Sequence, residues 1–288
     1  MTGQPTYLLG VGATKAGTTW MYRYLAGHPA CHLRTIKELH YFDKREGAAR
    51  ARQLKLNEAR IAKLSRKAGK AGGRALQDAH DWGRVLVAGD DGHAAYRDYL
   101  EAGRGMRNVV GDITPSYASM PEAQLTQMAS VAEDVRVVYL MREPVSRFWS
   151  HLRMVVSREL GNEGDFARAC ARRLDQVLGG EPSAIIDRSD YRGALTRLWG
   201  AVRPTRLLVM FQENLISQAG AQRLCTFLGL PMHEADTEAR VHEGRALQMT
   251  EAQRQRVRRF LQPQYEFVAT VFPDHPAAWR AHTDGVTA

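Results

Sequence analysis

The sequence predicts an α/β fold: a single domain with a central, mostly parallel sheet flanked by helices. Short apolar runs that fit buried strands alternate along the chain with longer segments of helical periodicity, and short turns join them. Such alternation is typical of a parallel sheet covered on both faces. The 288 residues suffice for one large domain with a sizeable core. No internal repeat or low-complexity linker divides them, so we expect one domain over 1–288.

The expected elements follow in order along the chain. Tyr7–Val11 is an apolar run that ends in glycines, and Thr18–Ala26 continues as a helix with one apolar face. The other expected strands are 108–113, 135–141 and 206–211. The other expected helices begin at Pro144 and cover 191–202, 219–228 and 250–272, the last with a kink or break at Pro263. We expect an inserted excursion at roughly 44–107, in which the basic stretch 45–73 forms an exposed helix or is partly ordered.

Composition and charge limit the classes of function. The hydrophobic share of 44% and the charged share of 25% are those of an ordinary globular protein. Forty Lys and Arg less thirty-one Asp and Glu leave a net charge of +9, which favours anionic ligands. No apolar run approaches the ~20 residues that span a bilayer, and no basic region precedes the first apolar stretch, so we expect a cytoplasmic protein. Three scattered cysteines, without metal-ligand spacing, predict reduced thiols and no metal site.

The loop after the first strand is predicted to form an anion site. In "GVGATKAGTTW" a strand, a glycine turn and a helix N-terminus follow one another, so free N–H groups and the helix dipole converge. Lys15 precedes Gly17, whereas the nucleoside-triphosphatase loop carries its lysine after the second glycine and before a Ser or Thr. All seven lysines lie at or before Lys70, and Lys15 and Lys37 stand in motif-like loops. Without the Gly-Lys-[Ser/Thr] triplet, nothing here calls for Mg²⁺, and sulfuryl transfer needs less charge neutralisation than phosphoryl transfer.

The sequence resembles the sulfotransferases that use 3′-phosphoadenosine 5′-phosphosulfate, at several places in that family's order between about 7 and 270. "GATKAGTTWMYRYLAGHP" is similar to the family's 5′-phosphosulfate loop, and "MREPVSRFWSHL" to its 3′-phosphate element. "KELHYFD" and "GDITPSY" are similar to motifs of the glycosaminoglycan sulfotransferases, which modify heparan sulfate. "HEGR" is similar to the loop that closes over the 3′-phosphate.

The resemblance implies a donor site and its residues. The donor would leave 3′,5′-adenosine bisphosphate as product, and no metal is expected. Lys15 would stabilise the leaving 5′-phosphate. Arg142, at a strand end, would grip the 3′-phosphate together with Ser150 two turns on; alternatively, Arg142 pairs with Glu143 or Glu159. The full expected donor-binding set is Lys15, Ala16, Gly17, Thr18, Thr19, Arg142, Ser150, Gly244 and Arg245.

On the acceptor side, Glu38 is the expected general base, because the attacking hydroxyl must lose a proton. His40 is the second expected catalytic residue, and Lys37, Asp43 and Thr114 are expected to bind the acceptor. The resemblance implies a small-molecule or glycan acceptor, sulfated on oxygen or nitrogen. It implies neither a nucleic-acid partner nor a membrane span, and it leaves the oligomeric state open.

Some positions depart from the family motifs. Asp112-Ile113 stands where glycosaminoglycan enzymes carry Glu-Lys, Glu243 replaces a lysine, and Leu39 replaces a proline. Two other functions stay open at this point. One is a kinase with an altered phosphate loop, which the missing Gly-Lys-[Ser/Thr] triplet disfavours. The other is a non-enzymatic binder of nucleic acid or acidic polymers through the basic stretch 44–74, which could instead line the acceptor cleft.

Overall fold

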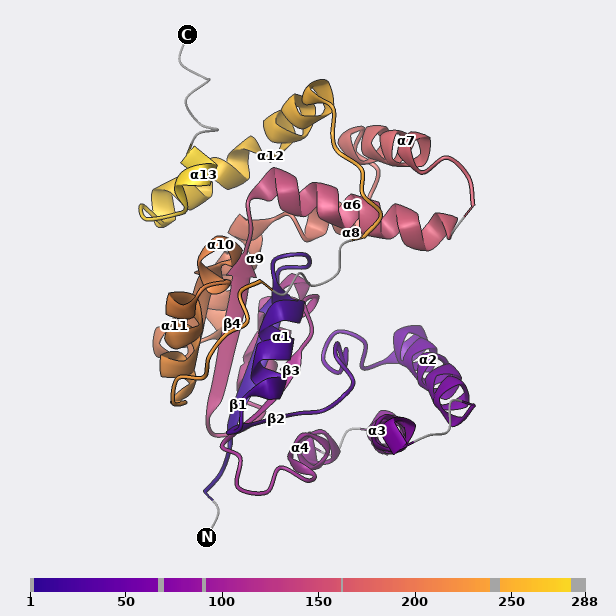
Figure 1. Cartoon of the computed structure of the whole chain (residues 1–288), viewed down its shortest axis with the longest axis vertical. Helices are drawn as coiled ribbons and strands as arrows, with labels where there is room; N and C mark the ends of the chain where they lie inside the picture. The colour runs from indigo at the N-terminus through magenta and orange to yellow at the C-terminus, as the bar shows by residue number, and fades with distance from the viewer. Residues whose placement is uncertain (1–2, 67–69, 90–91, 162, 239–243, 281–288) are drawn as a thin grey trace.

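The centre of the molecule is a sheet of five parallel strands in the order β2-β3-β1-β4-β5, flanked by helices (Figure 1). It is seen in a computed structural model that describes residues 3–66, 70–89, 92–161, 163–238 and 244–280. The strands are β1 (Thr6–Gly12), β2 (Cys31–Leu33), β3 (Val109–Ile113), β4 (Val135–Met141) and β5 (Leu207–Phe211).

The helices and short 3-10 turns occupy the intervals between strands and most of the chain after β5. Those before β4 are α1 (Thr18–Gly27), α2 (Gly47–Ser65), α3 (Lys70–Ala88), α4 (Ala94–Glu101), η1 (Tyr117–Ser119) and α5 (Glu122–Ala129). Those between β4 and β5 are α6 (Pro144–Leu160), α7 (Phe166–Leu178), α8 (Ala184–Asp187), α9 (Tyr191–Ala201) and η2 (Pro204–Arg206). Those after β5 are α10 (Gln212–Leu215), α11 (Gln218–Leu228), α12 (Glu251–Val271) and α13 (Ala277–Arg280).

The central strands are buried on both faces, which explains their sequence. β1 lies between β3 and β4, with Gly10 opposite Ile113 in one register and Gly12 opposite Tyr139 in the other. All but the first residue of β1 and all but Arg136 of β4 are buried. Parallel strands covered on two faces read as continuous apolar runs, as these do. The prediction of a mostly parallel α/β sheet is confirmed.

Most expected elements are confirmed to within one residue or two. Of the kink or break expected at Pro263, the break is wrong: α12 continues on both sides of the proline, although its ring removes one helical hydrogen bond. The strand β2 was not expected, because its three residues are too few to show a period. The helices α5 and α7 were not expected either. The three cysteines are free and buried, as expected.

The excursion contains three helices, which lie to the right of and below the sheet in Figure 1. In α2 the only described residue that is buried is Asn57, so the expectation of an exposed basic helix holds there. In contrast, α3 packs against α2 and contributes Ala79, Trp82, Val85 and Leu86 to the same hydrophobic core as the sheet. The excursion is therefore fastened to the core through α3.

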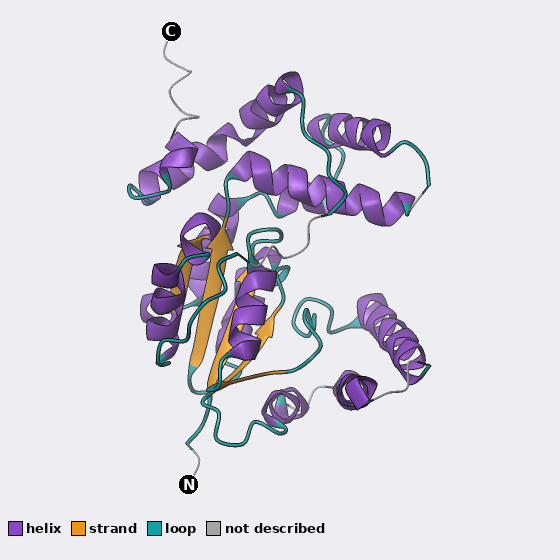
Figure 2. Ribbon diagram, viewed as in Figure 1, coloured by secondary structure: helices purple, strands orange, loops and turns teal. Residues whose placement is uncertain are grey.

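A second hydrophobic cluster lies beyond the carboxyl ends of the strands. It is formed by α6, α7, α8 and α12, which cross above the sheet in Figure 2. Phe148 and Leu152 of α6 lie at its centre and are fully buried. This layer fixes α6 next to the loop that follows β1.

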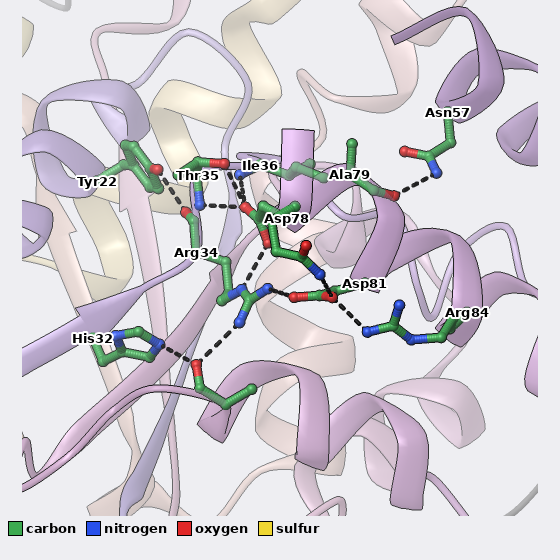
Figure 3. Close-up of polar contacts among 12 residues, drawn as sticks. Tyr22, His32, Arg34, Thr35, Ile36, Asn57, Asp78, Ala79, Asp81 and Arg84 are labelled. Carbon is green, nitrogen blue, oxygen red and sulfur yellow. Dashed lines mark hydrogen bonds and ion pairs between the residues drawn. The ribbon is translucent and has the colours of Figure 1, made fainter. Parts of the chain in front are cut away.

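A buried carboxylate ties α3 to the segment that leads into "KELHYFD". Asp78 of α3 is 2% exposed and accepts hydrogen bonds from the backbone N–H groups of Thr35 (2.6 Å) and Ile36 (3.1 Å) and from the Thr35 hydroxyl (Figure 3). It also pairs with Arg34 at 2.7 Å. Burial alone would raise the pKa of Asp78, but the bonds from Thr35 and Arg34 hold it below its ordinary value.

We expect Asp78→Ala to lower the free energy of unfolding by about 2–4 kcal/mol, because it leaves two backbone N–H groups without a partner and removes one of the two carboxylates that pair with the Arg34 guanidinium. Arg84 on the same helix is the matched control: its side chain is 71% exposed and pairs only at the surface. Arg84→Ala should change the free energy by less than about 0.5 kcal/mol. Urea denaturation measures both, and equal midpoints for the two variants would contradict the role of Asp78.

The same carboxylate predicts an acid-labile fold. The pKa of Asp78 is lower in the folded chain than the roughly 3.9 of an unfolded one, so its stabilisation is complete above that value. It is lost as the pH falls through the lowered pKa. Asp78→Asn should therefore flatten the decline of stability below about pH 4.

Candidate active site

The loop between β1 and α1 presents an uncapped helix N-terminus. Gly17 precedes α1 with φ 93°, no side chain caps the helix, and no acidic residue lies in its first turn. Glycine is required because that φ is strained for other residues, and an added Cβ would lie 3.2 Å from Gln212. The first N–H groups of α1 are therefore available to an anion, and the dipole favours one.

Lys15 lies in this loop among other positive charges. Burial lowers the pKa of its ammonium first, and Arg142, Arg153 and Arg158 lower it further, while Glu38 opposes them. None of the ion pairs formed within the described ranges includes Lys15. The loop thus concentrates positive charge without neutralising it.

Two guanidinium groups hold the loop's carbonyl groups against α6. Arg142 donates from Nη1 to the Lys15 carbonyl at 3.3 Å, and Arg147 donates to the Thr14 carbonyl at 3.4 Å. Arg147 is completely buried and also bonds the carbonyl of Ile185 and the hydroxyl of Ser189. Both side chains therefore position the loop as well as add charge to it.

Arg142 is not paired with a carboxylate in the described structure. Glu143 instead caps α6 at the N–H groups of Val145 and Ser146 and accepts a bond from Tyr265. Glu159 pairs with Arg173 at 2.7 Å. The alternative in which Arg142 serves as an ion-pair partner for Glu143 or Glu159 is therefore wrong. Ser150 lies in α6, half-buried, about two turns beyond Arg142.

Several buried polar atoms around this loop lack a hydrogen-bond partner within the described structure. They are Thr14 Oγ1, Arg147 Nε, His151 Nδ1 and Arg153 Nε. His151 is 1% exposed, and burial together with Arg147 and Arg188 lowers its pKa to about 2, so the imidazole is neutral. Native structures rarely leave buried polar groups unpaired. Unpaired polar atoms beside a cationic loop and a free helix N-terminus are the features of an anion site.

The expected catalytic residues share an unusual backbone conformation. Outside glycine, four described residues have a positive φ, and three of them are Lys15 (71°), Glu38 (63°) and His40 (55°). The fourth is His93, whose ring bonds the Tyr41 hydroxyl at 3.0 Å. Strained conformations of this kind cluster at functional sites, because the surrounding structure must hold them in place.

Glu38 is exposed and ionised. Its side chain is 43% exposed and accepts a bond from the Lys37 ammonium at 2.7 Å. Partial burial would raise the pKa of Glu38, but Lys37, His40 and Arg158 together hold it below its ordinary value. The charge of Glu38 also opposes the lowering of the Lys15 pKa by burial and by the surrounding arginines.

His40 is oriented by Asp43 and Ser116. Its Nδ1 lies 3.0 Å from the Asp43 carboxylate and 3.2 Å from the Ser116 hydroxyl, which itself donates to Asp43 at 2.6 Å. Burial would raise the pKa of Asp43, but these bonds lower it. Asp43 thus acts on the imidazole, and the structure shows it as a support for His40.

Thr114 also takes a supporting place. It is completely buried, accepts a bond from the His40 backbone N–H at 3.4 Å and donates to Asp112 at 2.7 Å. Asp112 is 2% exposed and also accepts bonds from Tyr96 and Tyr117. The expectation that Thr114 contacts the acceptor is therefore not met in this structure, since the residue has no exposed surface.

Of the "HEGR" motif, His242 and Glu243 lie outside the described residues. Arg245 donates to the Gly161 carbonyl at 3.4 Å and covers the Phe166 ring at 4.4 Å, at the carboxyl end of α6. Arg142 precedes the other end of that helix of 17 residues. The structure therefore does not bring the Arg245 side chain together with Arg142.

Sequence reasoning missed Arg147, His151 and Ser116. Arg147 and His151 lie within the quoted stretch "MREPVSRFWSHL" and are four residues apart, which puts them on one face of a helix. That spacing could have identified them. Ser116 follows the Thr-Pro pair of "GDITPSY" and carries no signal of its own.

Comparison with protein families decides the identity of this arrangement. A model of the sulfotransferase family matches residues 8–234, which is well over half of the chain. The chain belongs to this family. Lys15, Glu38 and Arg142 all lie inside the matched range. Of the expected site residues only Gly244 and Arg245 lie beyond it.

Solved structures show the same fold for this sulfotransferase. A sulfotransferase from Alicyclobacillus acidocaldarius is similar with a TM-score of 0.63 at 20% identity, over 96% of this chain and 99% of that one. The sulfotransferase domain of the Synechococcus PCC 7002 olefin synthase is similar with a TM-score of 0.53 at 17% identity, over 91% and 94%. A search of curated proteins gave no significant match.

Two further findings concern only the described part of the chain. Every helix there is too short or too polar to cross a bilayer. In the same ranges, no three His, Cys, Asp or Glu side chains are grouped as ligands for a metal ion.

The unpaired Thr14 hydroxyl allows a test of anion binding at this loop. We expect Thr14→Val to leave the free energy of unfolding unchanged or to raise it by up to about 1 kcal/mol, because it removes a buried hydroxyl without a partner. The same change should weaken binding of 3′,5′-adenosine bisphosphate about tenfold, since one hydrogen bond to a charged group is lost. Chemical denaturation and calorimetry measure the two effects.

Thr6 provides the matched control at the other end of β1, where its hydroxyl bonds Asp134 at 2.7 Å. Thr6→Val should cost about 1 kcal/mol of stability and leave nucleotide binding unchanged. If Thr14→Val destabilises the free protein as much as Thr6→Val does, the Thr14 hydroxyl already has a partner in the free protein, and its role in binding a ligand is contradicted.

Proposed function

We propose that this sulfotransferase moves a sulfuryl group from 3′-phosphoadenosine 5′-phosphosulfate to a hydroxyl, or an amine, of a small-molecule or glycan acceptor. The observation that carries the proposal is Lys15. It lies in the loop before the uncapped N-terminus of α1, and Arg142 bonds its carbonyl at 3.3 Å. Burial, Arg142 and other cations lower the pKa of its ammonium, and the carboxylate of Glu38 opposes them. An anionic donor and a hydroxyl that must lose a proton would be accommodated side by side.

The donor would be held by two groups of residues. The 5′ end would meet Lys15, the loop backbone at Ala16 and Gly17, and the N-terminus of α1 at Thr18 and Thr19. The 3′-phosphate would meet Arg142 and Ser150, in line with the resemblance of "MREPVSRFWSHL". We include Gly244 and Arg245 from that resemblance, which requires Arg245 to leave the ring of Phe166.

Transfer is a displacement at sulfur. A bond forms between the acceptor oxygen and sulfur, and the bond between sulfur and the bridging oxygen of the 5′-phosphate breaks. The acceptor's proton passes to the Glu38 carboxylate. The Lys15 ammonium stabilises the negative charge that develops on the departing phosphate oxygen. His40, oriented by Asp43, and Lys37 beside Glu38 hold the acceptor.

The acceptor class follows from the sequence motifs. "KELHYFD" contains Lys37, Glu38, His40 and Asp43, and it is similar to a motif of the glycosaminoglycan enzymes. A carbohydrate or glycoconjugate hydroxyl is accordingly the acceptor we propose.

Calorimetry with nucleotides tests the donor site. We expect metal-independent binding of 3′,5′-adenosine bisphosphate, much weaker binding of 5′-AMP, and no gain from ATP with Mg²⁺. Arg142→Ala should weaken binding of the bisphosphate about 10–100-fold, since hydrogen bonds to a charged phosphate contribute roughly 1.5–3 kcal/mol. The affinity for 5′-AMP should fall less, because Arg142 acts on the 5′-phosphate loop only through its bond to the Lys15 carbonyl. Binding of ATP alone would support the kinase alternative and exclude this proposal.

Replacement of the base tests the chemistry. Glu38→Gln should lower turnover about 10²–10⁴-fold while the affinity for 3′,5′-adenosine bisphosphate stays constant. The lowered pKa of Glu38 keeps the carboxylate ionised, so turnover should fall only as the pH drops below about 4.3. Lys37→Met removes the main partner and should shift this acid limb to higher pH. Chromatography measures the rate at which 3′,5′-adenosine bisphosphate is released and so reports both effects. Turnover by Glu38→Gln within about tenfold of wild type would rule out the carboxylate as base.

A further inference from the structure

A pocket opens beside the proposed acceptor site, on the side of the excursion. It lies between the loop that follows His40, the beginning of α2 and the carboxyl-terminal part of α3, and has a volume of about 70 Å³. That is smaller than a complete small-molecule site of roughly 300–1,000 Å³, so the pocket takes one end of a ligand. The lining residues that matter below are His40, Tyr41, Lys44, Arg50, Val85 and Leu86.

The polar side of the pocket is mainly positive. Lys44, Arg45 and Arg50 line it, against the single carboxylate of Glu46. Lys44 is half-buried and forms no ion pair with any described residue. Arg50 donates from Nε to the Leu86 carbonyl at 2.9 Å, which fixes its guanidinium at the wall. These positive side chains would stabilise a negative group of a ligand.

Another part of the wall is apolar and rigid. Tyr41, Val85 and Leu86 form it and are otherwise buried, each 6% exposed. The Tyr41 ring stacks on Tyr96 with centroids 4.2 Å apart, which leaves it little freedom. This wall suits the apolar part of a ligand, whose burial contributes about 0.8 kcal/mol per methylene.

His40 connects the pocket to the transfer site. It lines the pocket, and it lies two residues from Glu38 with its Nδ1 held by Asp43. An acceptor whose hydroxyl reaches Glu38 can therefore extend past His40 into the pocket. A pocket of this volume admits the end of a small molecule rather than the length of a polymer.

We propose that the acceptor is a small anionic amphiphile: its hydroxyl lies at Glu38 and His40, its apolar part against Tyr41, Val85 and Leu86, and its negative group at Lys44 and Arg50. This inference rests on the proposed function, because it takes Glu38 as the place of transfer. It adds to that proposal the two chemical features, a negative charge and an apolar segment, by which this chain selects its acceptor.

Three sugar probes separate these features. Octyl β-D-glucuronide carries both, octyl β-D-glucoside lacks the charge, and methyl β-D-glucuronide lacks the tail. Binding is measured by calorimetry with and without 3′,5′-adenosine bisphosphate, below the concentration at which micelles form. We expect the octyl glucuronide to bind about tenfold more tightly than the octyl glucoside, as one charged hydrogen bond gives. It should bind about tenfold more tightly than the methyl glucuronide, as burial of two methylenes gives.

Variants assign the charge preference to the pocket. Lys44→Gln should reduce the preference for glucuronide over glucoside to about twofold and leave binding of the bisphosphate unchanged. Lys63→Gln is the control, because Lys63 is exposed on α2 and does not line the pocket; it should keep the full preference. Equal binding of the two octyl sugars, a preference that survives Lys44→Gln, or no binding of the octyl glucuronide would each overturn the inference.

The experiment distinguishes this inference from the function on which it rests. If the bisphosphate binds and the sugars do not, the pocket assignment fails and the sulfuryl-transfer proposal stands. If the bisphosphate does not bind, the proposed function fails. The measurements without nucleotide then decide whether the pocket takes anionic amphiphiles at all.

Discussion

The arrangement of the site depends on the parallel pairing of β1 with β3 on one side and β4 on the other. Parallel strands end at the same edge of a sheet, and neighbours lie about 4.8 Å apart. The chain therefore leaves β1 toward Lys15, β3 toward Thr114 and β4 toward Arg142 from adjacent points. Three segments that are far apart in the sequence converge because of this one constraint. A loss of register in β1 would move all of them at once.

The convergence collects positive charges that repel one another. Lys15, Arg142 and Arg147 have no carboxylate partner among the described residues, while nearby carboxylates are occupied elsewhere. Glu143 caps α6, and Asp112 accepts bonds from two tyrosines and Thr114. The stability of the rest of the fold must therefore hold the free site together. An anionic ligand relieves this repulsion and binds only the folded chain, so the same arrangement that costs stability gives affinity.

The sequence predicted those parts of the fold that local patterns determine. β1 and β4 are long apolar runs, and the glycines and prolines that end helices act within a few residues, so these elements were expected almost at their observed bounds. β2 exists only because it pairs with β3, and its three residues have no period. The backbone at Pro263 stays helical because Leu261, Tyr265 and Val268 of α12 are buried, which outweighs the missing hydrogen bond.

The same division applies to the site. Lys15, Glu38 and Arg142 stand in motifs whose spacing is visible in the sequence, and the structure brings Arg142 into hydrogen-bond contact with the Lys15 carbonyl. The supporting residues could not be found in this way. Whether Asp43 faces a substrate or the ring of His40, and whether Thr114 is exposed, depends on contacts between segments about 70 residues apart.

Within the excursion, the helix α3 both holds the segment before Glu38 and lines the pocket. Asp78, near the middle of α3, holds the segment that leads to Glu38 and His40, whose left-handed backbone must be maintained by its surroundings. Val85 and Leu86 lie seven and eight residues further along, about two turns, and therefore on the same face of that helix. They line the pocket beside His40. If the acceptor packs against these side chains as we propose, it contacts the element that holds the segment before Glu38, and acceptor binding would be coupled to the geometry of Glu38 through α3.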